Sequence, residues 1–276
     1  MINTPHSIHF LIHLGLNTGS LELKTIPKLY LHHQIEHDGF YQLHLLTPKQ
    51  VLIVDLQDTV RCLEMSGKEI WSGGTPFTDL ACRGQKIYYV SDVLGDENIY
   101  CTHLANFRQA VQDKKDRKIL RGYPSTNHYD TNYILADENH LIVISVHVED
   151  EAAPPIFHIY HFALKTWWKG HTAKSQLHRA CLHADGDMLV LWTNNTLQKL
   201  KLDGDNQMLT EQWSCANLMG SFSVCSASGI TYVGALNCIY VISMFGELKT
   251  MLAKVYGINN NIIHVAVTSA LVKNAV

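Results

Sequence analysis

The feature that most constrains the fold is an internal repeat of short strand-like segments. Runs of four to eight residues rich in Val, Ile, Tyr and Leu recur between polar turns, and helical periodicity is scarce. Each unit has a short first segment with small residues, a polar turn, a strongly apolar second segment, a tight turn and two further segments. The first segments begin 37 to 56 residues apart, near Phe40, Phe77, Tyr133, His178 and Phe222.

Four antiparallel strands in a unit of about 40 residues are typical of a β-propeller blade. A β-sandwich or a pair of barrels would also be all-β, but neither requires a repeat with the same internal order of strands and turns. The repeat therefore favours a propeller of four-stranded antiparallel blades. The sequence predicts five continuous blades over residues 38–74, 75–110, 128–170, 176–214 and 220–256.

The two ends of the chain predict a sixth, split blade. The C-terminal run "IIHVAV" (Ile262–Val267) matches the first strand of a blade, and the missing strands are found at the N-terminus. Residues 7–16, 20–26 and 28–37 match a second, third and fourth strand. We therefore expect one domain, residues 1–276, with six blades, the sixth formed by residues 7–37 and 258–276. Pairing the C-terminal strand with the N-terminal strands would remove two open sheet edges.

The repeat resembles the general β-propeller superfamily over essentially the whole chain. The segment "GKEIW" (Gly67–Trp71) looks like the blade end of quinoprotein-type repeats, and "LKTWW" (Leu164–Trp168) is a loose echo of it. The repeats are also loosely similar to WD40 repeats, but no Trp-Asp dipeptide occurs. The Asp-box of sialidases is absent. Kelch repeats are not expected either, because a Gly-Gly pair occurs only once, at Gly73-Gly74. The resemblance thus implies the shape of the molecule and no cofactor.

Composition excludes several partners. A net charge of −3 and a pI near 6.6 provide no general attraction to nucleic acid or to an anionic membrane. The longest apolar runs, such as Leu141–Val146, are too short to span a bilayer. His9 and His13 interrupt the apolar N-terminus, which lacks the basic region of a signal peptide. Seven cysteines without a CxxC pair predict buried thiols in the cytoplasm, or in a host cytosol after export without a classical signal.

The 17 histidines raise the question of a metal site. His33 and His37 are four residues apart, but on a strand this spacing places them roughly 13 Å apart, which is too far for one ion. The sequence therefore predicts no metal site there. The first strands of the blades would line a central channel, and their polar residues are candidates for binding a metal or a substrate. These channel candidates are His44, Asp79, Asp137, His178, His183, Asp185 and His264. The alternative is that they line a water-filled channel and are satisfied by water and backbone.

Signals for catalysis are otherwise weak. No GxSxG nucleophile elbow and no phosphate-binding glycine loop occur. The cysteines stand among apolar residues, as core thiols do. We therefore do not expect an enzyme.

Two departures from the repeat predict a binding surface. The link between the second and third blades, residues 108–132, carries more cationic than acidic side chains, and the turn Val148–Pro155 is enlarged and acidic. Loops that join successive blades and loops between second and third strands emerge on one face, so the two segments are expected to be neighbours. The predicted partner-binding residues are Lys114, Lys115, Arg117, Lys118, Arg121, Tyr123, Glu149, Asp150 and Glu151.

The sequence thus predicts a non-catalytic scaffold that binds another protein, one with an acidic patch, through one face and the 108–132 segment. The alternative is an enzyme, or a binder of a small ligand or metal, that uses the His and Asp groups of the central channel. A third possibility is that the chain is one subunit of a larger assembly.

Overall fold

The structure is a computed structural model of the 276-residue chain. It describes residues 6–14, 29–37, 40–47, 49–55, 59–64, 66–74, 77–91, 98–125, 128–150, 152–172, 176–183, 185–204, 206–227, 229–235, 238–253 and 262–270. The strands β1, β2 and β23 are described by their backbones.

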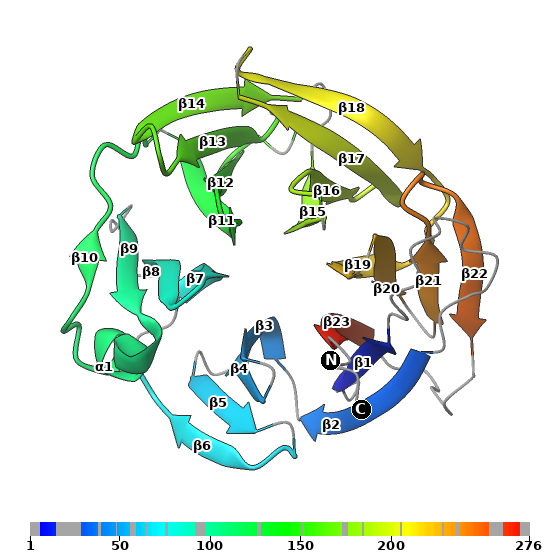
Figure 1. Ribbon diagram of the computed structural model, residues 1–276, viewed down its shortest axis with the longest axis horizontal. Helices are drawn as coiled ribbons and strands as arrows, with labels where there is room; N and C mark the ends of the chain where they lie inside the picture. The colour runs from blue at the N-terminus through cyan, green and yellow to red at the C-terminus, as the bar shows by residue number, and fades with distance from the viewer. Residues whose placement is uncertain are drawn as a thin grey trace, which may run out of the picture.

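Five four-stranded antiparallel sheets stand around a central axis as the blades of a propeller (Figure 1). Blade 1 consists of β3 (Phe40–Thr47), β4 (Gln50–Asp55), β5 (Val60–Glu64) and β6 (Glu69–Ser72). Blade 2 consists of β7 (Phe77–Arg83), β8 (Lys86–Ser91), β9 (Ile99–His103) and β10 (Lys118–Ile119). Blade 3 consists of β11 (Tyr129–Ala136), β12 (His140–His147), β13 (Ile156–His161) and β14 (Thr166–His171). Blade 4 consists of β15 (Leu177–Leu182), β16 (Met188–Trp192), β17 (Thr196–Asp203) and β18 (Met208–Cys215). Blade 5 consists of β19 (Ser221–Ala227), β20 (Ile230–Ala235), β21 (Cys238–Ile242) and β22 (Leu248–Ala253).

The second strand of each blade is the most buried part of the fold. All five residues of β16 and all six of β20 are buried, because each of these strands is covered on both faces by neighbouring sheets. A strand that is buried on both faces has a continuous apolar sequence, such as "MLVLW" in β16. The core accordingly lies between blades: Leu52, Phe77 and Phe107 pack between blades 1 and 2, and Leu191 and Val233 pack between blades 4 and 5.

The outer part of blade 2 departs from the prediction. After β9 the chain forms the short helices η1 (Leu104–Asn106) and α1 (Phe107–Gln112), and then returns as β10. Much of the segment expected to link blades 2 and 3 is therefore inside blade 2, as its third connection and its fourth strand. The helix forms because Phe107, Ala110 and Val111 share one face and are buried against the core.

The remaining strands form a three-stranded sheet that closes the ring, in the order β2 (Leu29–His37), β1 (His6–Leu14), β23 (Ile262–Ala270). β23 pairs with β1 along nine residues, which confirms that the C-terminal strand pairs with an N-terminal strand. β23 also packs against β19 and β20 of blade 5 and reaches β3 of blade 1 (Figure 1).

The prediction of six four-stranded antiparallel blades is wrong: the structure has five. β1 and β23 run parallel, whereas the first two strands of every other blade are antiparallel. A parallel pair requires a long connection rather than a hairpin, and here the five blades between the two strands provide it. The expected third strand, residues 20–26, lies outside the described residues.

Candidate functional site

Two of the predicted channel residues meet at the inner edges of blades 1 and 2. His44 in β3 and Asp79 in β7 are both buried, with Nε2 of the histidine 3.3 Å from Oδ1 of the aspartate. The other carboxylate oxygen, Oδ2, accepts a hydrogen bond of 2.9 Å from the backbone N–H of Ile134 in β11. One carboxylate therefore contacts the first strands of both neighbouring blades.

Arg179 extends this cluster to blade 4. Its Nη2 lies 3.9 Å from Oδ1 of Asp79, and its guanidinium carbon lies 5.2 Å from the centre of the Tyr133 ring. Blade 3 separates blades 2 and 4 along the ring, so the arginine side chain crosses the inner side of β11. The Tyr133 hydroxyl in turn donates 2.7 Å to the carbonyl of His178 in β15. We call His44, Asp79, Tyr133 and Arg179 the channel cluster.

Burial sets the protonation of the channel cluster. Burial, and to a lesser extent the charge of Arg179, lowers the pKa of His44 to about 3, so the imidazole is neutral near pH 7. Burial raises the pKa of Asp79 to about 6, opposed by Arg179 and by hydrogen bonds from the N–H groups of Ile134 and Leu80. Near neutral pH the cluster therefore holds one carboxylate facing one guanidinium, beside a neutral histidine.

Three other channel candidates lie in or beside turns and have other partners than His44 and Asp79. Asp137 follows β11 and accepts hydrogen bonds from the N–H groups of Asn139 and His140, both at 2.6 Å. His183 and Asp185 lie in the β15–β16 turn with their Nδ1 and Oδ1 atoms 2.8 Å apart. The pKa of the Asp185 carboxyl falls to about 2, since hydrogen bonds from Lys199 and His183 outweigh its partial burial. The side chain of His264 in β23 lies outside the described residues, as do those of His33 and His37 in β2.

The prediction omitted three residues that organise these groups: Arg179, Tyr133 and Lys199. Arg179 had a readable signal, since a cation stands next to His178 on a segment predicted to line the channel. Lys199 had a weaker signal, because β17 also contains Gln198 and Lys201, and nothing in the sequence distinguishes Lys199 from them. Its buried Nζ contacts Oδ2 of Asp185 and lies 3.3 Å from Oδ2 of Asp187.

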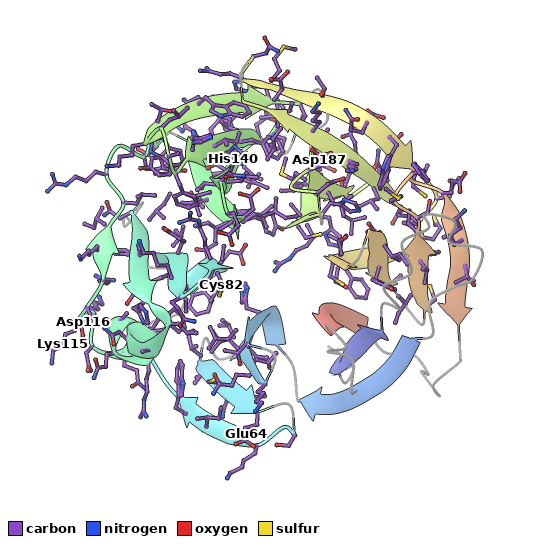
Figure 2. All side chains as sticks on the ribbon, in the orientation of Figure 1. Glu64, Cys82, Lys115, Asp116, His140 and Asp187 are labelled. Atoms are coloured by element: carbon purple, nitrogen blue, oxygen red, sulfur yellow. The ribbon has the colours of Figure 1, made fainter. Side chains whose placement is uncertain are left out.

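The predicted basic residues lie along the outer edge of blade 2. Lys114 and Lys115 follow α1, Lys118 belongs to β10 and Arg121 comes just after it; all four are exposed. Figure 2 shows Lys115 at the periphery of the ring. Arg117 is half-buried, with its guanidinium carbon 4.0 Å from the centre of the Tyr100 ring. We call Lys114, Lys115, Arg117, Lys118 and Arg121 the basic edge.

The sequence predicted that the basic segment and the acidic turn lie on one face of the propeller. In the structure only part of the basic segment lies on that face. In an antiparallel blade, the turn between strands two and three emerges where successive blades are linked, and the connection between strands three and four emerges at the opposite end. Lys114 and Lys115 lie between β9 and β10, the third and fourth strands, whereas Arg121 and Tyr123 lie in the link to β11. Only Arg121 and Tyr123 are therefore on the face of the acidic turn. The difference arises because β10 belongs to blade 2.

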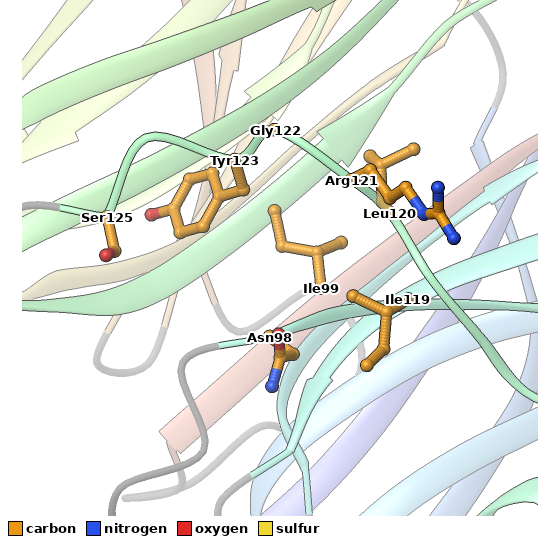
Figure 3. Close-up of a pocket in the computed structure, with 8 residues that line it drawn as sticks. All are labelled: Asn98, Ile99, Ile119, Leu120, Arg121, Gly122, Tyr123 and Ser125. Carbon is orange, nitrogen blue, oxygen red and sulfur yellow. The ribbon is translucent and has the colours of Figure 1, made fainter.

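A pocket of about 320 Å³ opens where β9 and β10 meet the link to blade 3 (Figure 3). Its lining residues are Asn98, Ile99, Ile119, Leu120, Arg121, Gly122, Tyr123 and Ser125. In Figure 3 Ile99 and Ile119 occupy the middle of the pocket, with Arg121 and Tyr123 to either side. The pocket is thus lined by both polar and apolar residues, and Arg121 supplies a cation to it.

Tyr123 is held in place by blade 3. Its hydroxyl lies 3.0 Å from Oγ1 of Thr131 and 3.1 Å from Oγ of Ser145. Its ring packs edge-on against His158, with the centres 5.2 Å apart. Tyr123 is thus a fixed wall of the pocket, positioned before any partner arrives.

The acidic turn between β12 and β13 is exposed and internally hydrogen-bonded. Nδ1 of His147 accepts hydrogen bonds from the N–H groups of Glu149 and Asp150, at 3.2 and 2.9 Å. Oδ1 of Asp150 accepts a further bond of 2.9 Å from Ala152. Glu151 lies outside the described residues.

The described residues provide no sign of a metal cluster or of a membrane-spanning helix. They contain no group of three or more His, Cys, Asp or Glu side chains arranged to hold a metal ion. In the same part of the chain, no helix has both the length and the apolar character needed to cross a membrane.

Comparisons with known proteins concern the fold. No protein-family model matches the chain, and no curated protein matches it. Among solved structures, a protein of unknown function from Bacteroides caccae is similar with a TM-score of 0.51 and 11% identity, over 75% of this chain and 73% of that chain. The Dos1 propeller gives a TM-score of 0.44 with 10% identity over 74% of this chain and 56% of that chain. Hsv2 from Kluyvelomyces marxianus gives 0.44 with 9% identity, over 79% of this chain and 67% of that chain.

Proposed function

We propose that this protein is a non-catalytic scaffold that binds a partner protein through the outer edge of blade 2. The observation that carries the proposal is the basic edge itself. Within the described residues, none of the ion pairs involves Lys114, Lys115, Lys118 or Arg121. Exposed charges without a counter-ion, next to a pocket and an exposed isoleucine, are features of a surface that meets a complementary one.

The charge of the basic edge indicates the kind of partner. Five cationic side chains stand against the two carboxylates of Asp113 and Asp116, in a chain whose net charge is −3. The excess is local, so it suits an acidic patch on a protein better than the long phosphate backbone of a nucleic acid. The exposed Ile119, at 53%, offers an apolar contact among these charges.

We place the protein in the cytoplasm, or in a host cytosol. None of the seven cysteines, all of which lie in the described residues, forms a disulfide, and burial raises the pKa of Cys62 and Cys82 to about 11. Reduced thiols of this kind are typical of a reducing compartment.

The test is capture of partners by the purified protein from an extract of its native cell. Reversing the charges in a Lys114→Glu, Lys115→Glu, Lys118→Glu variant should remove the partner, and raising the salt concentration should weaken wild-type capture. The matched control reverses three exposed lysines in other blades: Lys68→Glu, Lys165→Glu and Lys201→Glu. Equal losses in both variants, or none in the first, would contradict the proposed surface.

A second candidate function is binding of a small anion in the central channel. It is favoured by Arg179, whose side chain remains 26% exposed although Asp79 and Tyr133 hold it in place. Inorganic phosphate or a dicarboxylate should then raise the melting temperature of the wild type and leave that of Arg179→Met unchanged. Metal analysis tests the related alternative, since a stoichiometric metal ion in the purified protein would contradict a simple scaffold.

A further inference from the structure

β10 is the outermost strand of blade 2, and its outer side is an open sheet edge in the described part of the chain. The sheet order is β10-β9-β8-β7, so β10 has β9 on one side. Open edges present backbone N–H and C=O groups on which another strand can pair. The question is which of these groups point outward.

The register of the β9–β10 pair answers it. Lys118 is opposite Cys101 and Ile119 is opposite Tyr100. The N–H of Leu120 donates 2.8 Å to the carbonyl of Ile99, so the hydrogen bonds to β9 are made by Lys118 and Leu120. In an antiparallel pair, hydrogen-bonded and non-hydrogen-bonded positions alternate. The N–H and C=O of Ile119 therefore point away from β9, toward the outer side.

Side chains around Ile119 define what could pair there. Ile119 is 53% exposed and is opposite Tyr100 in β9, so its side chain lies on the Tyr100 side of the sheet and not on the side of Ile99. In an antiparallel strand, the residue opposite Ile119 would project its own side chain on the same side of the sheet, beside the exposed Ile119. Next to it, Lys118 and Arg121 are exposed cations, and the stack on Tyr100 fixes Arg117.

We propose that an extended segment of an acidic partner protein adds to β10 as a fifth strand of blade 2. The segment alternates apolar residues, which lie on the side of Ile119, with Asp or Glu, which lie on the side of Lys118. This inference rests on the proposed function and specifies how the partner is recognised. Because β10 has two residues, the backbone contributes one pair of hydrogen bonds, and side-chain charge and apolar contact contribute the rest.

A defined peptide tests the inference. The probe is a fluorescein-labelled heptapeptide, Glu-Val-Asp-Ile-Glu-Val-Asp, and the readout is fluorescence anisotropy. The residue opposite Ile119 directs its N–H and C=O toward β10, and so do the residues two positions away. In this peptide these are the apolar residues, so their N–H groups should donate to β10. N-methylation of Val, Ile and Val should weaken binding at least tenfold, whereas N-methylation of the acidic residues should leave it within about twofold. A peptide with Lys in place of Asp and Glu should not bind.

Two protein variants provide the reciprocal test. Ile119→Pro removes the outward N–H and no hydrogen bond to β9, so it should fold and bind the peptide at least tenfold more weakly. Ile119→Asp places a repelling charge at the same point and should also lose binding. The matched control is Met208→Asp, which changes an exposed apolar residue, 55% exposed, on the outer strand of blade 4.

The outcomes separate the two proposals. Strand addition is overturned if the acidic peptide does not bind the wild type, or if both N-methylated peptides bind equally. It is also overturned if Ile119→Pro folds and binds normally. If any of these occurs while the triple charge reversal still removes the partner in the capture experiment, the proposed function stands without it. If the triple reversal leaves capture unchanged, the proposed function itself fails.

Discussion

Arg179 in blade 4 contacts Asp79 in blade 2, with 3.9 Å between Nη2 and Oδ1, although a whole blade separates them along the ring. The carboxylate of Asp79 also lies 3.3 Å from His44 in blade 1 and accepts a hydrogen bond from Ile134 in blade 3. One aspartate thus links the inner strands of four successive blades. Its side chain is 4% exposed, so water replaces few of these contacts when they are lost.

The first prediction follows from this position. Asp79→Ala should lower the free energy of unfolding by about 2–4 kcal/mol, because the Ile134 N–H and Arg179 lose their acceptor in a buried place. Asp79→Asn should cost less, since an amide oxygen can still accept from Ile134. Urea unfolding measures both. A coupling of at least about 0.5 kcal/mol is expected in a double-mutant cycle between Asp79→Asn and Arg179→Met, and purely additive effects would contradict the contact.

The second prediction concerns His158, which is 0% exposed and has no hydrogen-bond partner on either ring nitrogen among the described residues. Burial first, and then the charges of Lys169 and His171, lower its pKa to about 4. The unfolded chain, with a pKa near 6.5, binds the proton more readily than the folded chain. The stabilisation is therefore complete above pH 6.5 and decreases as the pH falls toward 4.

His158→Phe should flatten this dependence. Uptake of one proton on unfolding gives the free energy of unfolding a slope of at most about 1.4 kcal/mol per pH unit. Between pH 6 and 4.5 the slopes of the wild type and the variant should therefore differ by an amount that approaches this value. His44 and Asp79 titrate in both proteins and cancel in the comparison. Parallel curves of unfolding free energy against pH would show that His158 does not take up the proton on unfolding.

The blade pattern could be predicted because it depends on local sequence. Strands buried on both faces must be apolar throughout, as "MLVLW" in β16 shows, and the hairpin turns between them need polar residues or glycine. The pairing of the two chain ends was predictable for a similar reason. Ile262–Ala270 has the apolar character of an inner strand.

Strand direction and the outer part of blade 2 could not be predicted in the same way. Alternation of side chains is identical in both directions of a strand, so the parallel pairing of β23 with β1 leaves no trace in the sequence. β10 has only two residues, too few to show a period. The helix α1 has a helical apolar pattern at Phe107, Ala110 and Val111. It has only six residues, however, and lies next to a charged segment, so the pattern is too short to be recognised.

The channel cluster was half predictable. His44 and Asp79 were among the candidates because they are polar residues on first strands, and the structure brings the two side chains together. Asp137 and Asp185, chosen by the same argument, lie in turns, because a shift of one or two positions at a strand end moves a residue out of the channel. The reach of Arg179 across blade 3 depends on a long side chain and on the packing of three blades, which no local pattern encodes.

The third prediction compares two glycines with positive φ. Gly246 has φ of +82°, and a Cβ there would lie 2.7 Å from Cδ2 of Trp213, while Gly84 has φ of +55° with no atom within 4 Å of its Cβ position. Gly84→Ala should cost about 1 kcal/mol from backbone strain alone. Gly246→Ala should cost about 3 kcal/mol, because the Trp213 ring must also move and its Nε1 donates 2.9 Å to the carbonyl of Met244. If urea unfolding gave the same loss of stability for both variants, the Trp213 ring would be able to move aside without a measurable loss of free energy.

The fourth prediction concerns the closing sheet. Removing residues 262–276 deletes β23, which pairs with β1 along nine residues and packs against β19 and β20. The edge of β1 and the side of blade 5 then lose their cover, so we expect the melting temperature to fall by about 10 °C or more and the protein to associate through the exposed edge.

The matched control removes only residues 271–276 and keeps β23. It should melt like the full chain and remain unassociated in size-exclusion chromatography. A synthetic peptide of residues 262–276, added to the shorter protein, should restore part of the lost melting temperature, because it can occupy the vacant position beside β1. If removal of residues 262–276 changed neither the melting temperature nor the association state, β23 would not be the strand that holds the ring closed. If both truncated proteins lost the same stability, the cause would lie in the last six residues rather than in the pairing of β1 with β23.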